Sequence, residues 1–243
     1  MKTSGAHTLD STASKFLESV LRLQPRVAAF DCDGTLWSGD AGVTFFDWEI
    51  EQGVVPAEVG LAMRARYAEY KVGNVSEDHM CGEMVTMHKG IAETVIMQAA
   101  TKFMADSFPG HNFPEMQELV RRLHDDGCDI WAVSSSNEWV IRAGMKSFGI
   151  TDDHILATKV AVENGIITDR LVRVPSGPSK PKALREVVNK NIDAAFGNSR
   201  WDADMLAIAT HGFAVNPNPD LEAAARERGW TIHFPNGTRR PKT

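Results

Sequence analysis

Two aspartates, Asp31 and Asp33, stand directly after a short apolar run in the segment Val27-Ala-Ala-Phe-Asp-Cys-Asp-Gly-Thr35. A carboxylate can serve as a nucleophile, an acid or base catalyst, or a metal ligand, and two neighbouring carboxylates can divide these tasks. Magnesium commonly binds one or two carboxylates together with the phosphate of a substrate. The pair therefore indicates a magnesium and phosphate site. The alternative is a turn with solvated carboxylates.

Further polar residues stand at the ends of other apolar runs or just before a predicted helix. They are Ser134 to Asn137 after Ile130–Val133, Asn198, Ser199, Asp202 and Asp204 after Ile192–Phe196, and Lys180 before a helix at Lys182. Hydroxyls, free N–H groups at a helix start and a lysine can hold phosphate oxygens. Because ligands bind at the carboxyl ends of the strands in open α/β sheets, we expect these groups to converge on one crevice.

The elements that must position these groups alternate between strands and helices. A helix over 11–23 precedes the strand 27–30. Helices are then predicted over 113–126, 138–148, 182–189, 201–210 and 221–228, and strands over 130–133, 155–158, 192–196, 213–215 and 231–234, with a hairpin over 160–168 that turns at Asn164-Gly165. This alternation is typical of an α/β fold with a doubly wound, parallel, Rossmann-like sheet.

The segment 40–108 has a different character, because helical spacing of apolar residues dominates it and no strand pattern interrupts it. Gly53, Gly73 and Gly90 separate the helical stretches. We therefore expect an α/β core domain made of 1–39 and 109–243, with an inserted helical cap domain at 40–108.

The composition excludes several functional classes. The 243 residues carry a formal net charge of −6, with no basic patch of the kind that binds nucleic acid, and the run Arg239-Arg240-Pro-Lys242 is interpreted as a solvated end. No apolar run reaches the ~18 residues of a membrane span, and residues 1–8 lack the apolar centre of a signal peptide. Three cysteines without a zinc or disulfide spacing favour a reducing setting. We expect a cytoplasmic monomer or homodimer without nucleic-acid or membrane partners.

Four motifs occur in a fixed order over roughly residues 27–216. They are Asp31-Cys-Asp33-Gly-Thr35, Ser134 after a strand, Lys180 in Lys180-Pro-Lys-Ala-Leu184, and Gly197-Asn198-Ser199-Arg-Trp-Asp202-Ala-Asp-Met-Leu206. This order resembles the haloacid dehalogenase-like hydrolase superfamily, and most closely the branch that includes phosphoserine phosphatase. The first motif corresponds to the DxDGT pattern of that family and the last to its GDSxxDxxML pattern.

The resemblance implies a magnesium-dependent phosphomonoester hydrolase that acts on a small phosphorylated metabolite. In such an enzyme Asp31 would form an aspartyl-phosphate, Asp33 would serve as acid and base, and Lys180 would stabilise the transferring phosphoryl group. The implied magnesium ligands are Asp31, Asp33 through its backbone carbonyl, Asn198 and Asp202. The implied substrate and phosphate contacts are Ser134, Ser135, Gly34, Thr35, Asp40 and Lys180.

Two departures from the family pattern concern the metal and the substrate. Asn198 stands where the family usually has an aspartate ligand, so the site lacks one negative charge. Asp40 replaces the glutamate that meets the amine of phosphoserine, and no arginine occurs from 67 to 120, where the family holds the substrate carboxylate and where Cys81 aligns. These departures put phosphoserine in question as the substrate, and a different small phosphomonoester with an amine or hydroxyl near Asp40 fits as well.

Several alternatives stay open. Lys182 competes with Lys180, Ser134 could cap a helix, and Asp204 is better explained as a solvated helix residue. For the whole protein, the alternatives are a phosphotransferase or dehalogenase on the same fold, or a catalytically weak regulatory domain that binds phosphate or metal. The second aspartate, Asp33, argues against a dehalogenase.

Overall fold

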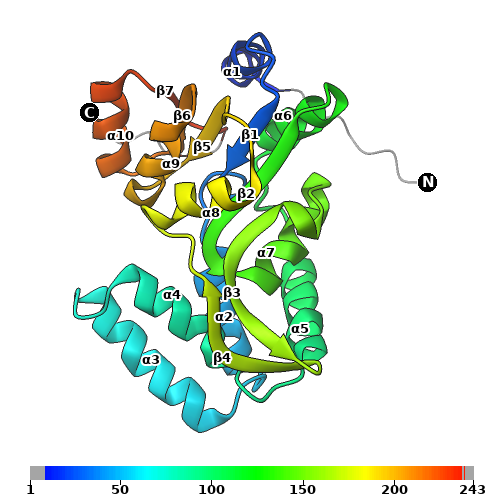
Figure 1. The fold of residues 1–243 in the computed structure, drawn as a ribbon, viewed down its shortest axis with the longest axis vertical. Coiled ribbons are helices and arrows are strands. Elements are labelled where there is room, and N and C mark those ends of the chain that lie inside the picture. Colours follow the sequence, from blue (N-terminus) through cyan, green and yellow to red (C-terminus); the bar gives the residue numbers. More distant parts are fainter. Residues whose placement is uncertain (1–8, 237, 239–243) are drawn as a thin grey trace.

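A seven-stranded sheet forms the centre of the computed structural model, which describes residues 9–236 and 238 (Figure 1). Its strand order is β4-β3-β2-β1-β5-β6-β7. The strands are β1 (Val27–Phe30), β2 (Asp129–Asn137), β3 (Ile155–Glu163), β4 (Ile166–Arg173), β5 (Ala194–Gly197), β6 (His211–Val215) and β7 (Thr231–His233). Every pairing is parallel except that of β3 with β4. The predicted α/β class with a mostly parallel sheet is confirmed.

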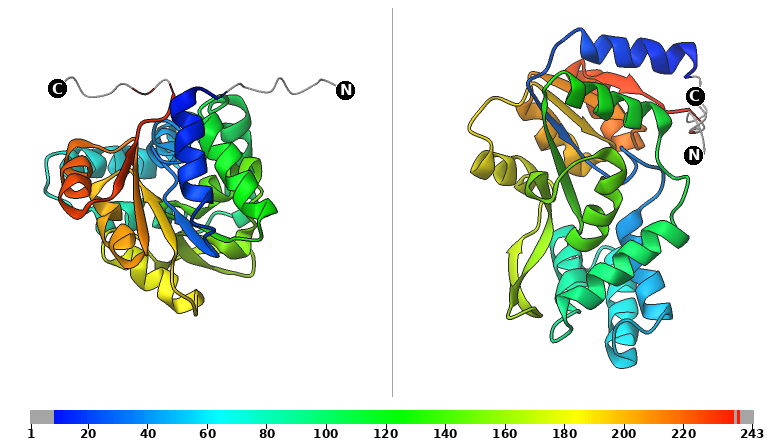
Figure 2. Two further views of the ribbon diagram at one scale, coloured as in Figure 1. Left: turned by 90° about the horizontal axis from the view of Figure 1, so that it is seen from above. Right: turned by 90° about the vertical axis from the view of Figure 1, so that its right-hand side faces the viewer.

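Helices cover both faces of this sheet, as Figure 2 shows from above. One face packs against α1 (Ser11–Leu21), α6 (Pro114–Asp125) and α7 (Glu138–Met145), and the other against α8 (Ser179–Val187), α9 (Ala203–Ile208) and α10 (Pro219–Arg228). In β1, Ala28 and Phe30 join the first core, while Val27 and Ala29 join the second. This double burial explains why β1 is a continuous apolar run rather than an alternating one.

Four helices follow one another in the segment after β1, without a strand between them. They are α2 (Ala41–Glu51), α3 (Ala57–Lys71), α4 (Glu77–Thr86) and α5 (Glu93–Asp106), and they form the lower part of Figure 1. Phe45 of α2 and Phe103 of α5 belong to the same core as the sheet. A separate small cluster of Phe46, Val55 and Met87 packs against residues of α3 and α4. The division into core and cap domains therefore stays a prediction.

The region around β3 differs from the sequence prediction. In place of a short strand over 155–158 and a separate hairpin, β3 runs without interruption from Ile155 to Glu163 and pairs antiparallel with β4 at the edge of the sheet. The predicted turn is present, since Asn164 and Gly165 both have positive φ angles, 51° and 77°, as a two-residue hairpin turn requires. Pairing with β4 keeps β3 extended past the point where its apolar run weakens.

The strand β2 also extends further than predicted. The serines expected in a loop, Ser134 to Ser136, continue the strand as far as Asn137, with a shift in its register against β3. Two shorter helices replace the single one predicted over 201–210, namely a 3-10 turn over Arg200–Asp202 and then α9.

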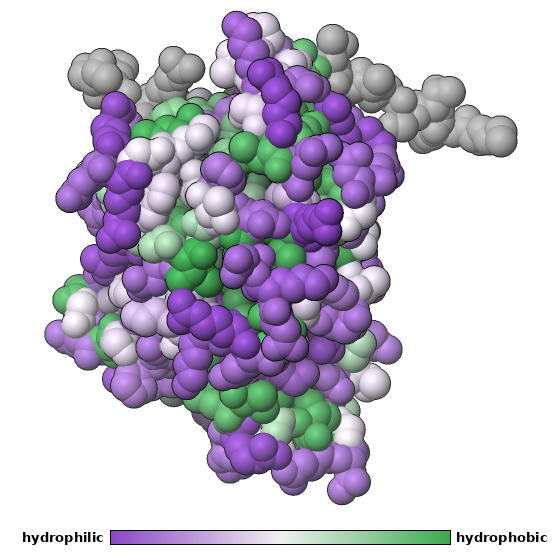
Figure 3. Space-filling model, turned by 45° about the horizontal axis from the view of Figure 1, so that its top comes forward, coloured by the Kyte–Doolittle hydropathy of each residue, from purple (hydrophilic) through white to green (hydrophobic). Residues whose placement is uncertain are grey.

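The surface in Figure 3 is largely hydrophilic, with apolar residues in small groups. Within the described residues no helix combines the length and apolarity that crossing a bilayer requires. Cys32, Cys81 and Cys128 are all free thiols. The expectations for residues 1–8 and for Arg239–Lys242 lie outside the described residues.

Candidate active site

A cavity of about 480 Å³ lies at the carboxyl ends of β1, β2 and β5. It collects most of the predicted site residues, which are Asp31, Asp33, Gly34, Asp40, Ser134, Ser135, Lys180 and Asn198. Two others, Thr35 and Asp202, lie behind the cavity wall and are fully buried. Asp204, for which the solvated position was preferred, is exposed on α9. The convergence follows from the parallel sheet, which brings the strand ends to one edge.

Asp31 extends the pairing of β1 with β5 by one residue, because its N–H donates to the carbonyl of Phe196 at 2.9 Å. Its side chain is held on both oxygens. Oδ1 accepts from the Nζ of Lys180 at 2.7 Å, and Oδ2 accepts from the hydroxyl of Thr35 at 2.8 Å. Burial raises the pKa of Asp31 to about 7, and the nearby carboxylate of Asp202 adds to this, against the opposing effect of Lys180. The geometry therefore fixes one carboxylate at the cavity floor.

Lys180 lies in the first turn of α8 and is 1% exposed. Its ammonium donates to Asp31 Oδ1, to Asp202 Oδ1 at 2.5 Å and to the carbonyl of Val133 at 3.1 Å. Burial alone would lower its pKa, but the carboxylates of Asp202 and Asp31 outweigh burial and raise it. All three N–H groups of this cation are thus engaged, and Lys180 binds the predicted nucleophile directly. Its competitor Lys182 is exposed.

Asp202, also predicted as a magnesium ligand, contacts Lys180 and the loop after β5. Its Oδ1 accepts from Lys180, and its Oδ2 accepts from the N–H groups of Asn198 at 3.0 Å and Ser199 at 2.9 Å and from the Ser199 hydroxyl at 3.1 Å. Both oxygens are therefore satisfied by the protein. Asp202 holds the loop after β5 and the ammonium of Lys180 in place.

Asp33 accepts hydrogen bonds on both oxygens. Oδ1 accepts from the indole N–H of Trp37 at 2.8 Å and from the N–H of Ala41 at 2.6 Å, and Oδ2 accepts from the hydroxyl of Ser136 at 2.7 Å. Burial raises the pKa of Asp33 to about 7, and the charge of Asp40 adds to this effect, while the three hydrogen bonds oppose it. A carboxyl group with such a pKa can give and take a proton near neutral pH.

Ser134 does not cap the helix that follows it, which was the alternative interpretation of this residue. The cap of α7 is Asn137, whose side-chain oxygen accepts from the N–H groups of Trp139 at 2.9 Å and Val140 at 3.4 Å. The hydroxyl oxygen of Ser134 accepts from the N–H of Ser136 at 3.1 Å, and its own O–H can point into the cavity that it lines. This arrangement suits a donor to a phosphate oxygen.

Asp40 both lines the cavity and caps α2. Its Oδ1 accepts from the N–H of Val43 at 2.8 Å. One of its oxygens is therefore used by the helix start, which satisfies an otherwise free backbone donor.

The oxygen donors at the cavity fit a magnesium ion. Asp31 offers a carboxylate and Asn198 an amide, and both line the cavity. Gly34 lets Asn198 approach, since a Cβ at position 34 would lie 1.8 Å from the Asn198 Nδ2. Over residues 9–236, no group of three or more His, Cys, Asp or Glu side chains forms a metal cluster. Magnesium needs few ligands from the protein, since it keeps several waters and uses substrate phosphate.

Some residues of the cavity were missed by the sequence analysis. Ser136 was seen only as part of a serine run, although it binds Asp33. Asn216 and Asn218 follow β6 and line the cavity, so the strand-end rule applied to 213–215 would have found them. Tyr70 and Glu77 also line it, but they come from α3 and α4, and no local pattern marked them.

Comparison with known proteins identifies the family. The model of the haloacid dehalogenase-like hydrolases matches residues 28–207. A histidinol-phosphatase of Neisseria meningitidis serogroup C is 25% identical over 217 residues, which are 85% of this chain and 97% of that protein.

Solved structures share the fold. A protein of unknown function from Bordetella pertussis Tohama I has a TM-score of 0.76 at 21% identity and covers 86% of this chain and 97% of its own. A phosphoserine phosphatase, solved as an analogue of the phospho-aspartyl intermediate, has a TM-score of 0.57 at 17% identity over 86% of this chain and 92% of its own.

The chain belongs to the haloacid dehalogenase-like hydrolase family, because the family model spans most of it. The resemblance inferred from the four motifs is confirmed, and with it the prediction of a phosphatase-type hydrolase similar to phosphoserine phosphatase.

Proposed function

We propose that this enzyme is a magnesium-dependent phosphomonoester hydrolase that acts on a small phosphorylated metabolite through an aspartyl-phosphate on Asp31. The observation that carries the proposal is the placement of Asp31. Its carboxylate is buried at the floor of the cavity and held by Lys180 and Thr35. A second carboxyl group, Asp33, lines the same cavity.

In the first step, a carboxylate oxygen of Asp31 attacks phosphorus, the bond to the leaving oxygen breaks, and that oxygen takes a proton from Asp33. In the second step, water attacks the phosphorus of the aspartyl-phosphate while Asp33 takes its proton. Inorganic phosphate leaves and the Asp31 carboxylate is regenerated. A carboxylate nucleophile divides one difficult displacement into two easier ones. The phosphoserine phosphatase that shares this fold, solved as an analogue of a phospho-aspartyl intermediate, supports such a path.

Lys180 and Ser134 both line the cavity in which the phosphoryl group would react. Lys180 orients Asp31 through its 2.7 Å bond and offsets part of the negative charge that Asp31 and Asp202 place in the buried site. Ser134 of β2 donates its hydroxyl to a phosphoryl oxygen. Donors fixed before the reaction stabilise the charge of the transition state without reorganisation.

Magnesium would be held by the Asp31 carboxylate, the Asp33 backbone carbonyl and the Asn198 amide. When bound, it supplies positive charge that lets an anion approach a phosphate. Asp202 supports this site from behind through the loop of Asn198 and Ser199.

The size of the site supports a small substrate. The catalytic cavity is about 480 Å³ and lies between the sheet and the helices α2, α3 and α4. The relatives are named for histidinol phosphate and phosphoserine, which are both small phosphomonoesters.

Release of phosphate from p-nitrophenyl phosphate and from a panel of phosphorylated metabolites, with and without Mg²⁺, tests the proposal. We expect turnover that requires Mg²⁺ and is lost in Asp31→Asn, since an amide is a poor nucleophile. Phosphate labelled on Asp31 in a trapped sample identifies the intermediate. Binding of Mg²⁺ and phosphate without turnover above the Asp31→Asn control would instead identify a regulatory domain, and transfer to added alcohols faster than to water would identify a phosphotransferase.

A further inference from the structure

A second cavity of about 190 Å³ adjoins the catalytic one, and the two share the wall residues Asp40, Tyr70, Glu77, Ser135 and Ser136. We call this second cavity the side chamber. Its remaining walls come from α2, α3 and α4 and from Asn137 of β2. Because the phosphoryl group must lie against Asp31, which lines the catalytic cavity, the adjoining side chamber offers a place where a leaving group can lie.

Aromatic and thioether groups form one part of the chamber wall. The ring centroids of Phe46 and Tyr67 lie 5.6 Å apart, as do those of Tyr67 and Tyr70. Met80 and Met84 complete this surface. Aromatic faces attract organic cations as well as apolar groups, and thioethers adapt to irregular ligands.

Carboxylates form the other part of the wall. Glu49 is 1% exposed and its Oε2 lies 2.8 Å from His88 Nε2, so it is paired inside the protein. Asp40 and Glu77 stand where the two cavities meet. Glu77 is fixed there, because its Oε2 accepts from the hydroxyl of Tyr70 and its Oε1 lies 3.8 Å from the thiol of Cys81. A preformed carboxylate of this kind binds a cation without paying the entropy of ordering.

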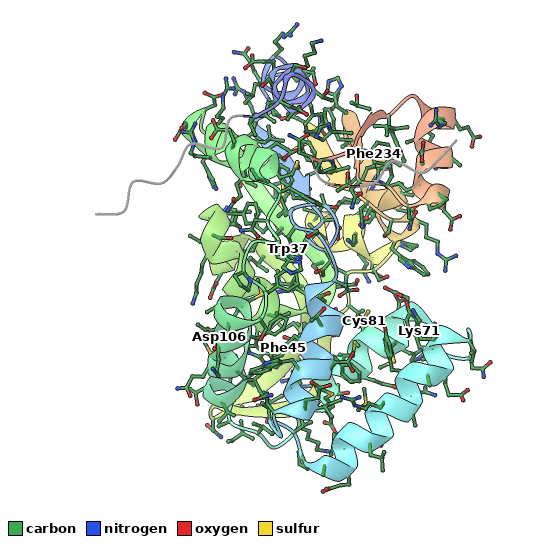
Figure 4. All side chains as sticks on the ribbon, turned by 180° about the vertical axis from the view of Figure 1, so that it is seen from behind. Trp37, Phe45, Lys71, Cys81, Asp106 and Phe234 are labelled. Atoms are coloured by element: carbon green, nitrogen blue, oxygen red, sulfur yellow. The ribbon has the colours of Figure 1, made fainter. Side chains whose placement is uncertain are left out.

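Positive groups for a substrate carboxylate are scarce around this space. The described residues that line the two cavities include no arginine, and their cations are Lys180 and Lys71. Lys180 is engaged beneath Asp31. Lys71 ends α3 and is exposed, and Figure 4 shows it farther out than Cys81 in that view. The chamber therefore favours a cation and disfavours a carboxylate.

We propose that the side chamber binds a leaving group that carries a positively charged amine or ring nitrogen and no carboxylate, and that Glu77 determines this specificity. Its volume exceeds the roughly 150 Å³ in which a benzene ring fits, so a ring-sized group can enter. The inference rests on the proposed phosphatase activity and extends it to a substrate class.

The selectivity of the enzyme among probe substrates tests the proposed specificity of the side chamber. We compare kcat/KM for histidinol phosphate, which has a cationic ring and amine, with that for phosphoserine and for uncharged phenyl phosphate. The wild type should prefer histidinol phosphate over both. Glu77→Gln keeps the shape but removes the charge, and it should lower the ratio of histidinol phosphate to phenyl phosphate at least about tenfold. The matched control is Asp78→Asn, one residue further along α4, which is exposed and lines neither cavity. It should keep the wild-type ratio.

Direct binding separates this inference from the proposed function. Calorimetry with histidinol alone should show binding to the wild type and to Asp78→Asn, and weaker binding to Glu77→Gln, whether or not the protein turns over any phosphomonoester. Absence of turnover on every substrate would overturn the proposed function but leave this binding result standing. Equal selectivity ratios in Glu77→Gln and wild type, or a preference of the wild type for phosphoserine, would overturn the inference about the chamber.

Discussion

The ammonium of Lys180 lies 2.7 Å from Oδ1 of Asp31, which joins the start of α8 to the end of β1 across 149 positions of the chain. Both side chains are buried, and Asp202 completes the set at 2.5 Å. One cation thus stabilises two carboxylates that the fold has removed from water. The same contact that keeps the site folded also orients the predicted nucleophile, so stability and activity should respond together.

Replacing Lys180 with Met should be severe, because it leaves two buried carboxylates without their cation. Removing one partner of a buried ion pair costs about 3–5 kcal/mol. We expect a loss of that size in the free energy of unfolding, measured with denaturant, and loss of phosphatase activity. Lys182→Met, two residues along the same helix and exposed, is the control, and it should change stability by less than about 0.5 kcal/mol. Equal behaviour of the two variants would contradict the assigned role of Lys180.

The pH dependence of kcat/KM should be bell-shaped around neutral pH. Burial raises the pKa of Asp31 and of Asp33 to about 7 each. Asp31 must be charged to attack, so kcat/KM should increase as pH rises through the pKa of Asp31. Asp33 must be protonated to assist the leaving oxygen, so kcat/KM should decrease as pH rises through about 7, the pKa of Asp33.

Two comparisons assign the two limbs of this profile. Magnesium on Asp31 favours its charged form, so the acidic limb should move to lower pH as Mg²⁺ is raised. The basic limb should be pronounced for an alkyl phosphate and weak for p-nitrophenyl phosphate, whose leaving group needs little protonation. A basic limb of the same size for both substrates would argue against Asp33 as the acid.

Asn198→Asp should tighten magnesium binding, because it supplies the negative charge that family members usually have at this position. The charge of the ligands tunes the affinity of oxygen sites for divalent cations over several decades. We expect the Mg²⁺ concentration for half-maximal activity, and the Kd from calorimetry, to fall about tenfold. Asn189→Asp adds the same charge at an exposed position and is the control. No change beyond that of the control would show that Asn198 does not contact the metal.

Gly34→Ala should damage the metal site through the side chain of Asn198. Gly34 has a φ of 74°, and a Cβ there would lie 1.8 Å from Asn198 Nδ2, so Asn198 must move. The backbone conformation alone costs about 1–2 kcal/mol for a residue with a side chain.

Gly73→Ala separates these two effects. Gly73 has a similar φ of 84° but nothing within 4 Å of the added Cβ. Both variants should lose similar stability in thermal unfolding, while only Gly34→Ala should raise the Mg²⁺ requirement. An equal rise in both variants would mean that backbone strain, rather than Asn198, is responsible.

The sequence alone determined the sheet and the residues at its edge. Four buried residues from Val27 to Phe30 form a strand because both of its faces are covered, and polar residues directly after such strands must lie at the carboxyl edge. Asp31 and Asn198 were therefore found from strand ends, and the hairpin from Asn164-Gly165. Ser134 was found from a predicted end at Val133 that lies inside β2. The end of β3 was missed, because pairing with β4, not the apolar pattern of β3 itself, keeps it extended.

Only the tertiary structure decided what each of these groups contacts. Asp202 is four residues from Asn198, and packing of α8 brings Lys180 to it. Ser136 reaches Asp33 across 103 positions, and Glu77 and Tyr70 enter the site from α4 and α3. The spacing of apolar and polar residues predicts strand ends and helix faces, because residues that are close in the chain determine these features. Contacts between distant segments depend on how helices dock, and no local pattern encodes that arrangement.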